Sequence, residues 1–171
     1  LLSVTDALGN ATSYTYDAYG RVLSVTDPAG STARYTYDAM GNIESYTDGA
    51  GFTTSYAYDQ ENRCIGVSDA LHGTQAYTYD ALGNLKSDTN PLGETNAYEY
   101  DALGRVTEIL ETGGLRTQYA YDASGNLTEE TDPNGNKTSY EYDALDRLIS
   151  ITEADGSRED YLYDALGNLV K

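Results

Sequence analysis

Residues 14–20 of the chain read Tyr-Thr-Tyr-Asp-Ala-Tyr-Gly, and this stretch decides the fold because its core motif returns seven more times. The motif, Tyr-x-Tyr-Asp, begins every 21 residues without an insertion or a deletion, at Tyr14, Tyr35, Tyr56, Tyr77, Tyr98, Tyr119, Tyr140 and Tyr161. A strict period of this length is typical of architectures in which each repeat is one supersecondary unit. The sequence therefore predicts a single array of eight repeats over residues 1–171.

The composition taken alone fits either a disordered segment or a tyrosine-rich β array. The 171 residues carry a formal net charge of −18, and Leu, Ile, Val and Phe together supply 29 of them, which is below the roughly 20% typical of ordered chains. The strict period and the 18 tyrosines exclude disorder. Only ten residues are Lys or Arg, which disfavours nucleic-acid binding, and one cysteine forms no internal disulfide. No stretch approaches the ~18 apolar residues of a membrane-spanning helix.

A second pattern, Asp-x-x-Gly, recurs at alternating intervals of 11 and 10 residues, as at residues 17–20 and 27–30. It is the signature of a type I turn in which Asp caps backbone amides and Gly adopts a positive φ. Three of the sixteen glycine positions hold Asn62, His72 and Asp146 instead, and these residue types are the most enriched at positive φ. Thirteen of the 17 aspartates occupy the first turn position, so turn capping explains them better than acid–base catalysis.

The segments between turns are six or seven residues long and rich in Tyr, Thr and Val. They are too short for ordinary helices and predict sixteen antiparallel strands, two per repeat, in successive β-hairpins. Because side chains alternate along a strand, Tyr14 and Tyr16 should share one face, and Ser13 and Thr15 the other. The predicted fold class is all-β: a long antiparallel sheet strip, solenoid or shell segment built from 21-residue hairpin repeats.

Each repeat is defined by two tyrosines, an aspartate and, where present, a turn glycine. These repeat-defining residues are Tyr14, Tyr16, Asp17, Gly20, Tyr35, Tyr37, Asp38, Gly41, Tyr56, Tyr58, Asp59, Tyr77, Tyr79, Asp80, Gly83, Tyr98, Tyr100, Asp101, Gly104, Tyr119, Tyr121, Asp122, Gly125, Tyr140, Tyr142, Asp143, Tyr161, Tyr163, Asp164 and Gly167. We expect them to be structural, and we predict no catalytic, cofactor-binding or metal-binding residue. Binding of Ca²⁺ by turn carboxylates stays open, although the spacing matches no EF-hand. His72 has no second histidine with which to form a metal or catalytic site.

A subtler alternation doubles the period to 42 residues. The residue before the first apolar position of each second strand is Arg21, Asn42, Arg63, Asn84, Arg105, Asn126, Arg147 or Asn168. Strands after Arg are apolar and strands after Asn are polar, which leaves two explanations open. Either the two hairpin types face different packing partners, as in a two-sheet arrangement, or a recent duplication carries no structural meaning. Equal burial of Val67 and Asp88 would contradict the first. Cys64 occupies one of the apolar positions and is expected to be a buried structural thiol.

The repeat unit resembles the YD repeat of Rhs proteins, bacterial wall-associated polymorphic toxins, insecticidal toxin complexes and teneurins. The resemblance is carried by residues 30–41, Gly-Ser-Thr-Ala-Arg-Tyr-Thr-Tyr-Asp-Ala-Met-Gly, and extends over the whole chain. It implies strips of β-hairpins that spiral into a hollow shell, which commonly encloses a toxic C-terminal domain or serves as a cell-surface scaffold. The sequence departs from the family pattern in that only Arg34 places an arginine before a tyrosine doublet.

These observations predict a non-enzymatic structural scaffold, a wall segment of an Rhs-type β-shell in a large secreted or surface protein. Two alternatives are the repeating subunit of an extracellular fibre and a carbohydrate- or adhesion-binding surface in which tyrosines stack on sugar rings. Uncapped repeats at both ends predict a segment of a longer chain or assembly. The expected partners are the rest of the chain, identical copies, an encapsulated toxin domain, or glycans. Separately, Asn-x-Thr sequons at Asn10, Asn126 and Asn136 are acceptor sequences for N-glycosylation in a secreted protein. No nucleic acid and no membrane span are expected, and the predicted location is extracellular or the cell surface.

Overall fold

The computed structural model describes residues 2–71 and 73–171, and every regular element in these ranges is a β-strand. No helix in the same ranges is long and apolar enough to cross a membrane. The strands are β1 (Ser3–Thr5), β2 (Ala11–Tyr16), β3 (Val22–Thr26), β4 (Thr32–Tyr37), β5 (Ile43–Thr47), β6 (Thr53–Tyr58), β7 (Cys64–Ser68), β8 (Thr74–Tyr79), β9 (Leu85–Thr89), β10 (Thr95–Tyr100), β11 (Val106–Leu110), β12 (Arg116–Tyr121), β13 (Leu127–Thr131), β14 (Lys137–Tyr142), β15 (Leu148–Thr152) and β16 (Arg158–Asp160). The predicted all-β class and the sixteen strands are confirmed.

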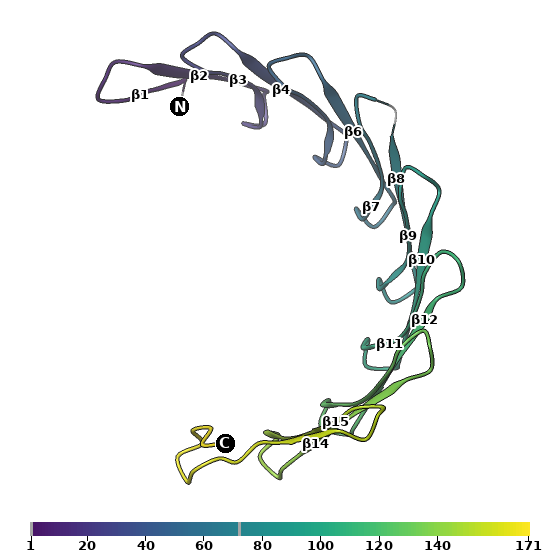
Figure 1. Cartoon of the computed structure of the whole chain (residues 1–171). Coiled ribbons are helices and arrows are strands. Elements are labelled where there is room, and N and C mark those ends of the chain that lie inside the picture. Colours follow the sequence, from purple (N-terminus) through teal and green to yellow (C-terminus); the bar gives the residue numbers. More distant parts are fainter. Residues whose placement is uncertain (1, 72) are drawn as a thin grey trace. The chain divides into compact units, whose positions relative to one another are not determined.

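The chain divides into two compact units. Residues 1–78 and 88–93 form the first unit, and residues 79–87 and 94–171 form the second. Within each unit the strands pair antiparallel in chain order, β1 to β8 in the first and β10 to β16 in the second (Figure 1). Antiparallel neighbours can be joined by a tight turn, whereas parallel neighbours need a long crossover. The short segments between turns therefore produce the successive hairpins that the sequence predicts.

The turns have the geometry that the Asp-x-x-Gly pattern predicts. In the turn at residues 17–20, the Gly20 amide donates to the Asp17 carbonyl over 3.1 Å, and the Asp17 amide donates to the Arg21 carbonyl over 2.9 Å. This is a type I turn followed by a left-handed residue, a common hairpin connection. Asn62 and Asp146 replace glycine at that position and have φ values of 62° and 58°, as expected. His72 lies outside the described residues.

Two kinds of turn alternate along the chain. We call those that follow a tyrosine doublet the YD turns and those between them the alternate turns. Hairpins closed by a YD turn carry a β-bulge, as in β2–β3, where the register shifts between Thr15 and Tyr16. Hairpins closed by an alternate turn, such as β3–β4, pair without a shift. Because a bulge adds one residue to one strand, Tyr16 still pairs with Val22 on the tyrosine face.

Neither unit encloses a hydrophobic core. No hydrophobic side chain in the described residues is buried, and the one buried polar side chain is Ser150. In β2 the tyrosines are half-buried while Ser13 and Thr15 are exposed, so the predicted division into two faces is confirmed. The large tyrosine rings cover one another and their neighbours along the sheet, which leaves them half-buried without any second layer above them.

Two expectations are wrong. Cys64 is half-buried rather than buried, because it pairs with Tyr58 at one face of the sheet and no second layer covers it. Val67 and Asp88 are both half-buried, which contradicts different packing partners for the two hairpin types. In each unit the strands form a single layer, so both types meet only their neighbours in the sheet.

Candidate functional site

The second tyrosine of a doublet connects its repeat to the preceding one. The Tyr37 hydroxyl donates a 2.8 Å hydrogen bond to the carbonyl of Val22, fifteen residues earlier. In the second unit the same bond joins Tyr100 to Leu85, Tyr121 to Val106 and Tyr163 to Leu148. These bonds add to the strand ladders, and at these four positions they give the tyrosine hydroxyl a role that an apolar side chain of equal size lacks.

Repeats that have Arg before the first apolar position of their second strand, which we call the arginine repeats, add a second connection. The Arg105 guanidinium donates to the Asp101 carboxylate over 2.6 Å, and its Cζ lies 4.6 Å from the centre of the Tyr121 ring. Its Nη1 also donates to the carbonyl of Asp122 over 3.2 Å. The guanidinium is thus held between two successive YD turns by an ion pair, a ring and a carbonyl. The same stacking joins Arg21 to Tyr37 and Arg147 to Tyr163.

Repeats that have Asn at this position, which we call the asparagine repeats, make a different connection. Asn126 Nδ2 donates to the carboxylate of Asp122 over 3.1 Å and to that of Asp146 over 2.9 Å. In the first unit, Asn42 bonds the side chain of Asn62 in the same way over 2.9 Å. Both residues that replace glycine in the described turns therefore follow an asparagine repeat and accept a bond from it.

Glycine stands in the YD turn after each arginine of the alternation, at Gly41, Gly83, Gly125 and Gly167. A Cβ added at Gly41 would lie 3.5 Å from Arg21 Nη1, so a longer side chain would meet the guanidinium. The 42-residue period thus has a structural meaning, although not the one expected: arginine and asparagine join their repeat to the next in different ways. Glycine also follows Asn84, at Gly104, so the alternation does not by itself fix the residue of the next YD turn.

Most turn carboxylates are engaged by their own turns. Asp38 Oδ1 accepts the amides of Met40 and Asn42, each over 2.9 Å. The side-chain hydrogen bond from Asn42 holds the pKa of Asp38 below its ordinary value, and in Asp143 the side-chain bond from Arg147 lowers the pKa in the same direction. These groups are ionised turn caps, as the sequence predicts, rather than carboxyls with a raised pKa suited to general acid catalysis.

The turn at residues 153–156 begins with Glu instead of Asp and departs from this pattern. Glu153 does not cap its own turn through its side chain; its Oε2 accepts the hydroxyl of Thr138 over 2.9 Å. The Ser157 amide donates instead to Asp155 Oδ1 over 2.8 Å. The extra methylene of Glu carries its carboxylate past the turn amides and toward the neighbouring hairpin.

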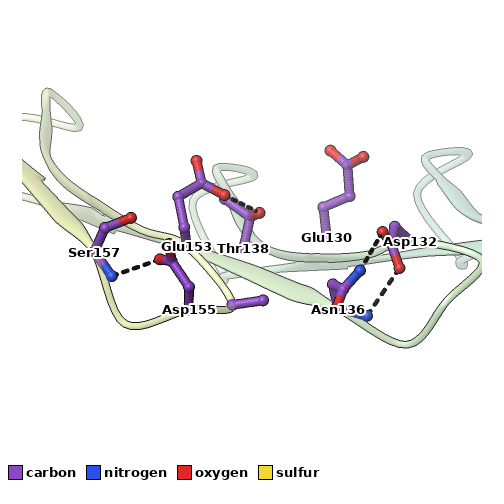
Figure 2. Close-up of a pocket in the computed structure, with 8 residues that line it drawn as sticks. Glu130, Asp132, Asn136, Thr138, Glu153, Asp155 and Ser157 are labelled. Carbon is purple, nitrogen blue, oxygen red and sulfur yellow. Dashed lines mark hydrogen bonds between the residues drawn. The ribbon is translucent and has the colours of Figure 1, made fainter.

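An acidic hollow of about 570 Å³ lies between two alternate turns of the second unit. Figure 2 shows Glu130, Thr138 and Glu153 pointing to the same side of the sheet, with Asp132 and Asp155 beneath them at the turns. Tyr119 pairs with Glu130 across the strands, and its pKa is raised mainly by burial and to a smaller extent by the negative charge of Glu130. No group of three or more His, Cys, Asp or Glu side chains in residues 2–71 and 73–171 is placed to hold a metal ion.

The repeat-defining residues are brought together in rows rather than in one pocket. The tyrosine doublets lie on the strands before the YD turns, and the aspartates and glycines form those turns. Sequence reasoning missed the contacts that Arg and Asn make with the following repeat. The signal that could have revealed them was present, because Asn62 and Asp146 both stand 20 residues after an asparagine of the alternation.

This geometry defines a tandem array of β-hairpins in which each repeat is bound to its neighbours. The RHS repeat family model matches residues 1–32, 16–53, 58–95, 79–117, 100–137, 121–158 and 142–171. The chain belongs to the RHS repeat family. A search of curated proteins gave no match.

Solved structures of toxin complexes share the fold. The pore form of the Photorhabdus luminescens Tc holotoxin is 19% identical over 99% of this chain, with a TM-score of 0.62. The crystal structure of TcdB2-TccC3 is 16% identical over 98% of this chain, with a TM-score of 0.51. The chain spans only 12% and 14% of the lengths of these two chains.

Proposed function

We propose that this chain is a non-enzymatic structural scaffold, a wall segment of an Rhs-type β-shell in a large secreted or surface protein. The observation that carries the proposal is the bonding between repeats. Each described repeat contributes strand pairing, and most add a tyrosine–carbonyl bond, a stacked arginine or an asparagine bridge to the next. Such a sheet is held by nearest-neighbour contacts instead of a central core. It can therefore extend as a thin wall.

Membership of the RHS repeat family and the likeness to Tc toxin folds support this role. Because the chain spans about an eighth of those structures, the remainder of the wall would come from further residues of the same protein. We infer that its partners are those residues and an enclosed toxin domain. The engagement of the turn aspartates in capping supports the absence of catalysis by these repeats.

Electron microscopy of the protein that naturally carries these repeats tests the proposal. Closed, hollow particles are the expected result, and protection of an internal domain from added protease would accompany them. Long filaments with a regular axial repeat would overturn the shell in favour of the fibre. Saturable quenching of tyrosine fluorescence by members of a glycan panel would instead support a carbohydrate-binding surface.

A further inference from the structure

The second unit contains the same hollow twice, 42 residues apart in the chain. The first hollow has a volume of about 570 Å³ and the second about 530 Å³, and each lies between two successive YD turns. Their shared lining includes an aspartate of each flanking turn and the second tyrosine of a doublet: Asp80, Tyr100 and Asp101 in the first, Asp122, Tyr142 and Asp143 in the second. Both hollows belong to asparagine repeats, with Asn84 and Asn126.

In an arginine repeat the corresponding space is filled from within. One repeat before the second hollow, the equivalent residues are Asp101, Tyr121 and Asp122, and these three hold the Arg105 guanidinium. The asparagine side chain is three heavy atoms shorter and ends at the turn carboxylates. Among the described residues, no cationic side chain lies over the ring of Tyr100 or Tyr142. The asparagine repeats therefore retain the ring and the carboxylate of their own turn but place no cation over the ring. The far aspartate of each hollow is paired with the arginine of its own turn, Asp101 with Arg105 and Asp143 with Arg147.

The charge of the second unit favours a cationic ligand. The unit contains eighteen Asp and Glu residues against seven Lys and Arg. Besides two turn aspartates, the first hollow is lined by Glu99 and Lys86. The second is lined by Glu141, which pairs with Arg158 over 2.9 Å, and by Asp146. A guanidinium suits this lining better than a metal ion or an ammonium, because it is planar, stacks on aromatic rings and donates to carboxylates and carbonyls at once.

We propose that the two hollows bind the guanidinium groups of two arginine side chains on an extended basic polypeptide. The model for the bound state is Arg105 itself, stacked on the tyrosine of the next repeat and bonded to the flanking turn. The hollows are four strands apart, which corresponds to about 19 Å across the sheet, and an extended chain covers that distance in about six residues. Two weak sites at this spacing reinforce each other when one chain occupies both. This binding activity is separate from the scaffold role and does not depend on it.

Calorimetric titration of the 171-residue chain tests the proposal. The probe is a Gly/Ser peptide with arginines six residues apart, and the matched peptide has citrulline at both positions, which keeps the shape and removes the charge. We expect saturable binding of the arginine peptide, at least tenfold weaker binding of the citrulline peptide, and weaker binding of a single-arginine peptide. Equal affinity for the arginine and citrulline peptides would overturn the proposal, and so would no detectable binding of the arginine peptide at low salt.

A pair of variants separates the hollow from general charge. Asn84→Arg should fill the first hollow from within, since Gly104 already provides the glycine that follows arginine repeats. Asn168→Arg adds the same charge at a position that lines neither hollow. We expect Asn84→Arg to weaken binding of the two-arginine peptide about tenfold and Asn168→Arg to change it less than twofold. Equal losses in the two variants, with unchanged circular dichroism spectra, would show that binding is nonspecific.

Discussion

Replacing Tyr121 with phenylalanine should destabilise the second unit, whereas the same change at Tyr142, one repeat later, should not. The Tyr121 hydroxyl donates to the Val106 carbonyl over 2.9 Å, while Tyr142 has no equivalent bond in the structure. A hydrogen bond of this kind contributes about 1 kcal/mol to the free energy of unfolding. Phenylalanine keeps the ring beneath Arg105 in the Tyr121→Phe variant, so the stacking at 4.6 Å should remain and the difference should report the hydroxyl alone.

Urea unfolding followed by far-ultraviolet circular dichroism measures this difference. Both tyrosines lie in the second unit, so the two variants perturb the same cooperative block. We expect Tyr121→Phe to lower the free energy of unfolding by about 1 kcal/mol and Tyr142→Phe by less than about 0.3 kcal/mol, with the m-value unchanged in both. Equal losses would refute the idea that the tyrosine–carbonyl bond joins repeats, because only one of the two hydroxyls makes it.

Three further outcomes follow from the turns and the sheet surface. Gly41→Asn should cost about 1 kcal/mol in urea unfolding, because φ at this position is 97° and the new side chain would meet Arg21. The lowered pKa of Asp38 stabilises the fold above the unfolded-state value near 3.8, and this contribution should be lost as the pH falls toward the lower folded-state pKa. An acid titration followed by circular dichroism should show the unfolding midpoint at a higher pH in Asp38→Asn than in the unchanged protein, because the variant lacks this stabilisation. Ser150→Ala should leave stability unchanged or raise it by up to about 1 kcal/mol, because the buried hydroxyl has no hydrogen-bond partner; a clear loss of stability in thermal melts would count against this.

The repeat period allowed most of the fold to be predicted. Short-range rules act within four residues, so the turn at residues 17–20 and the positive φ at Asn62 could be recognised from spacing and residue type. Alternation along a strand likewise placed Tyr14 and Tyr16 on one face. The resemblance of the repeat unit to the YD repeat predicted the family, and the RHS repeat family model matches the chain.

The candidate hollows could not be predicted in this way. They depend on contacts between residues 15 to 20 positions apart, such as Tyr100 with Leu85 and Asn126 with Asp146. The two-partner interpretation of the 42-residue period failed because it assumed a second layer above the sheet. The alternation of Arg and Asn instead acts within the single layer of strands, where each of these side chains contacts the next repeat.

The amino-acid sequence by itself determined the hairpins, their number and the placement of tyrosine and aspartate, because these follow from turn chemistry and the two-residue alternation of a strand. Only the tertiary structure decided how successive repeats are joined. Bringing residues of neighbouring hairpins side by side places Arg105 over Tyr121 and leaves the equivalent space beside Tyr142 to Asn126. Whether a repeat fills that space or leaves it open depends on side-chain length across the gap between two turns, and that distance exists only once the strands have paired.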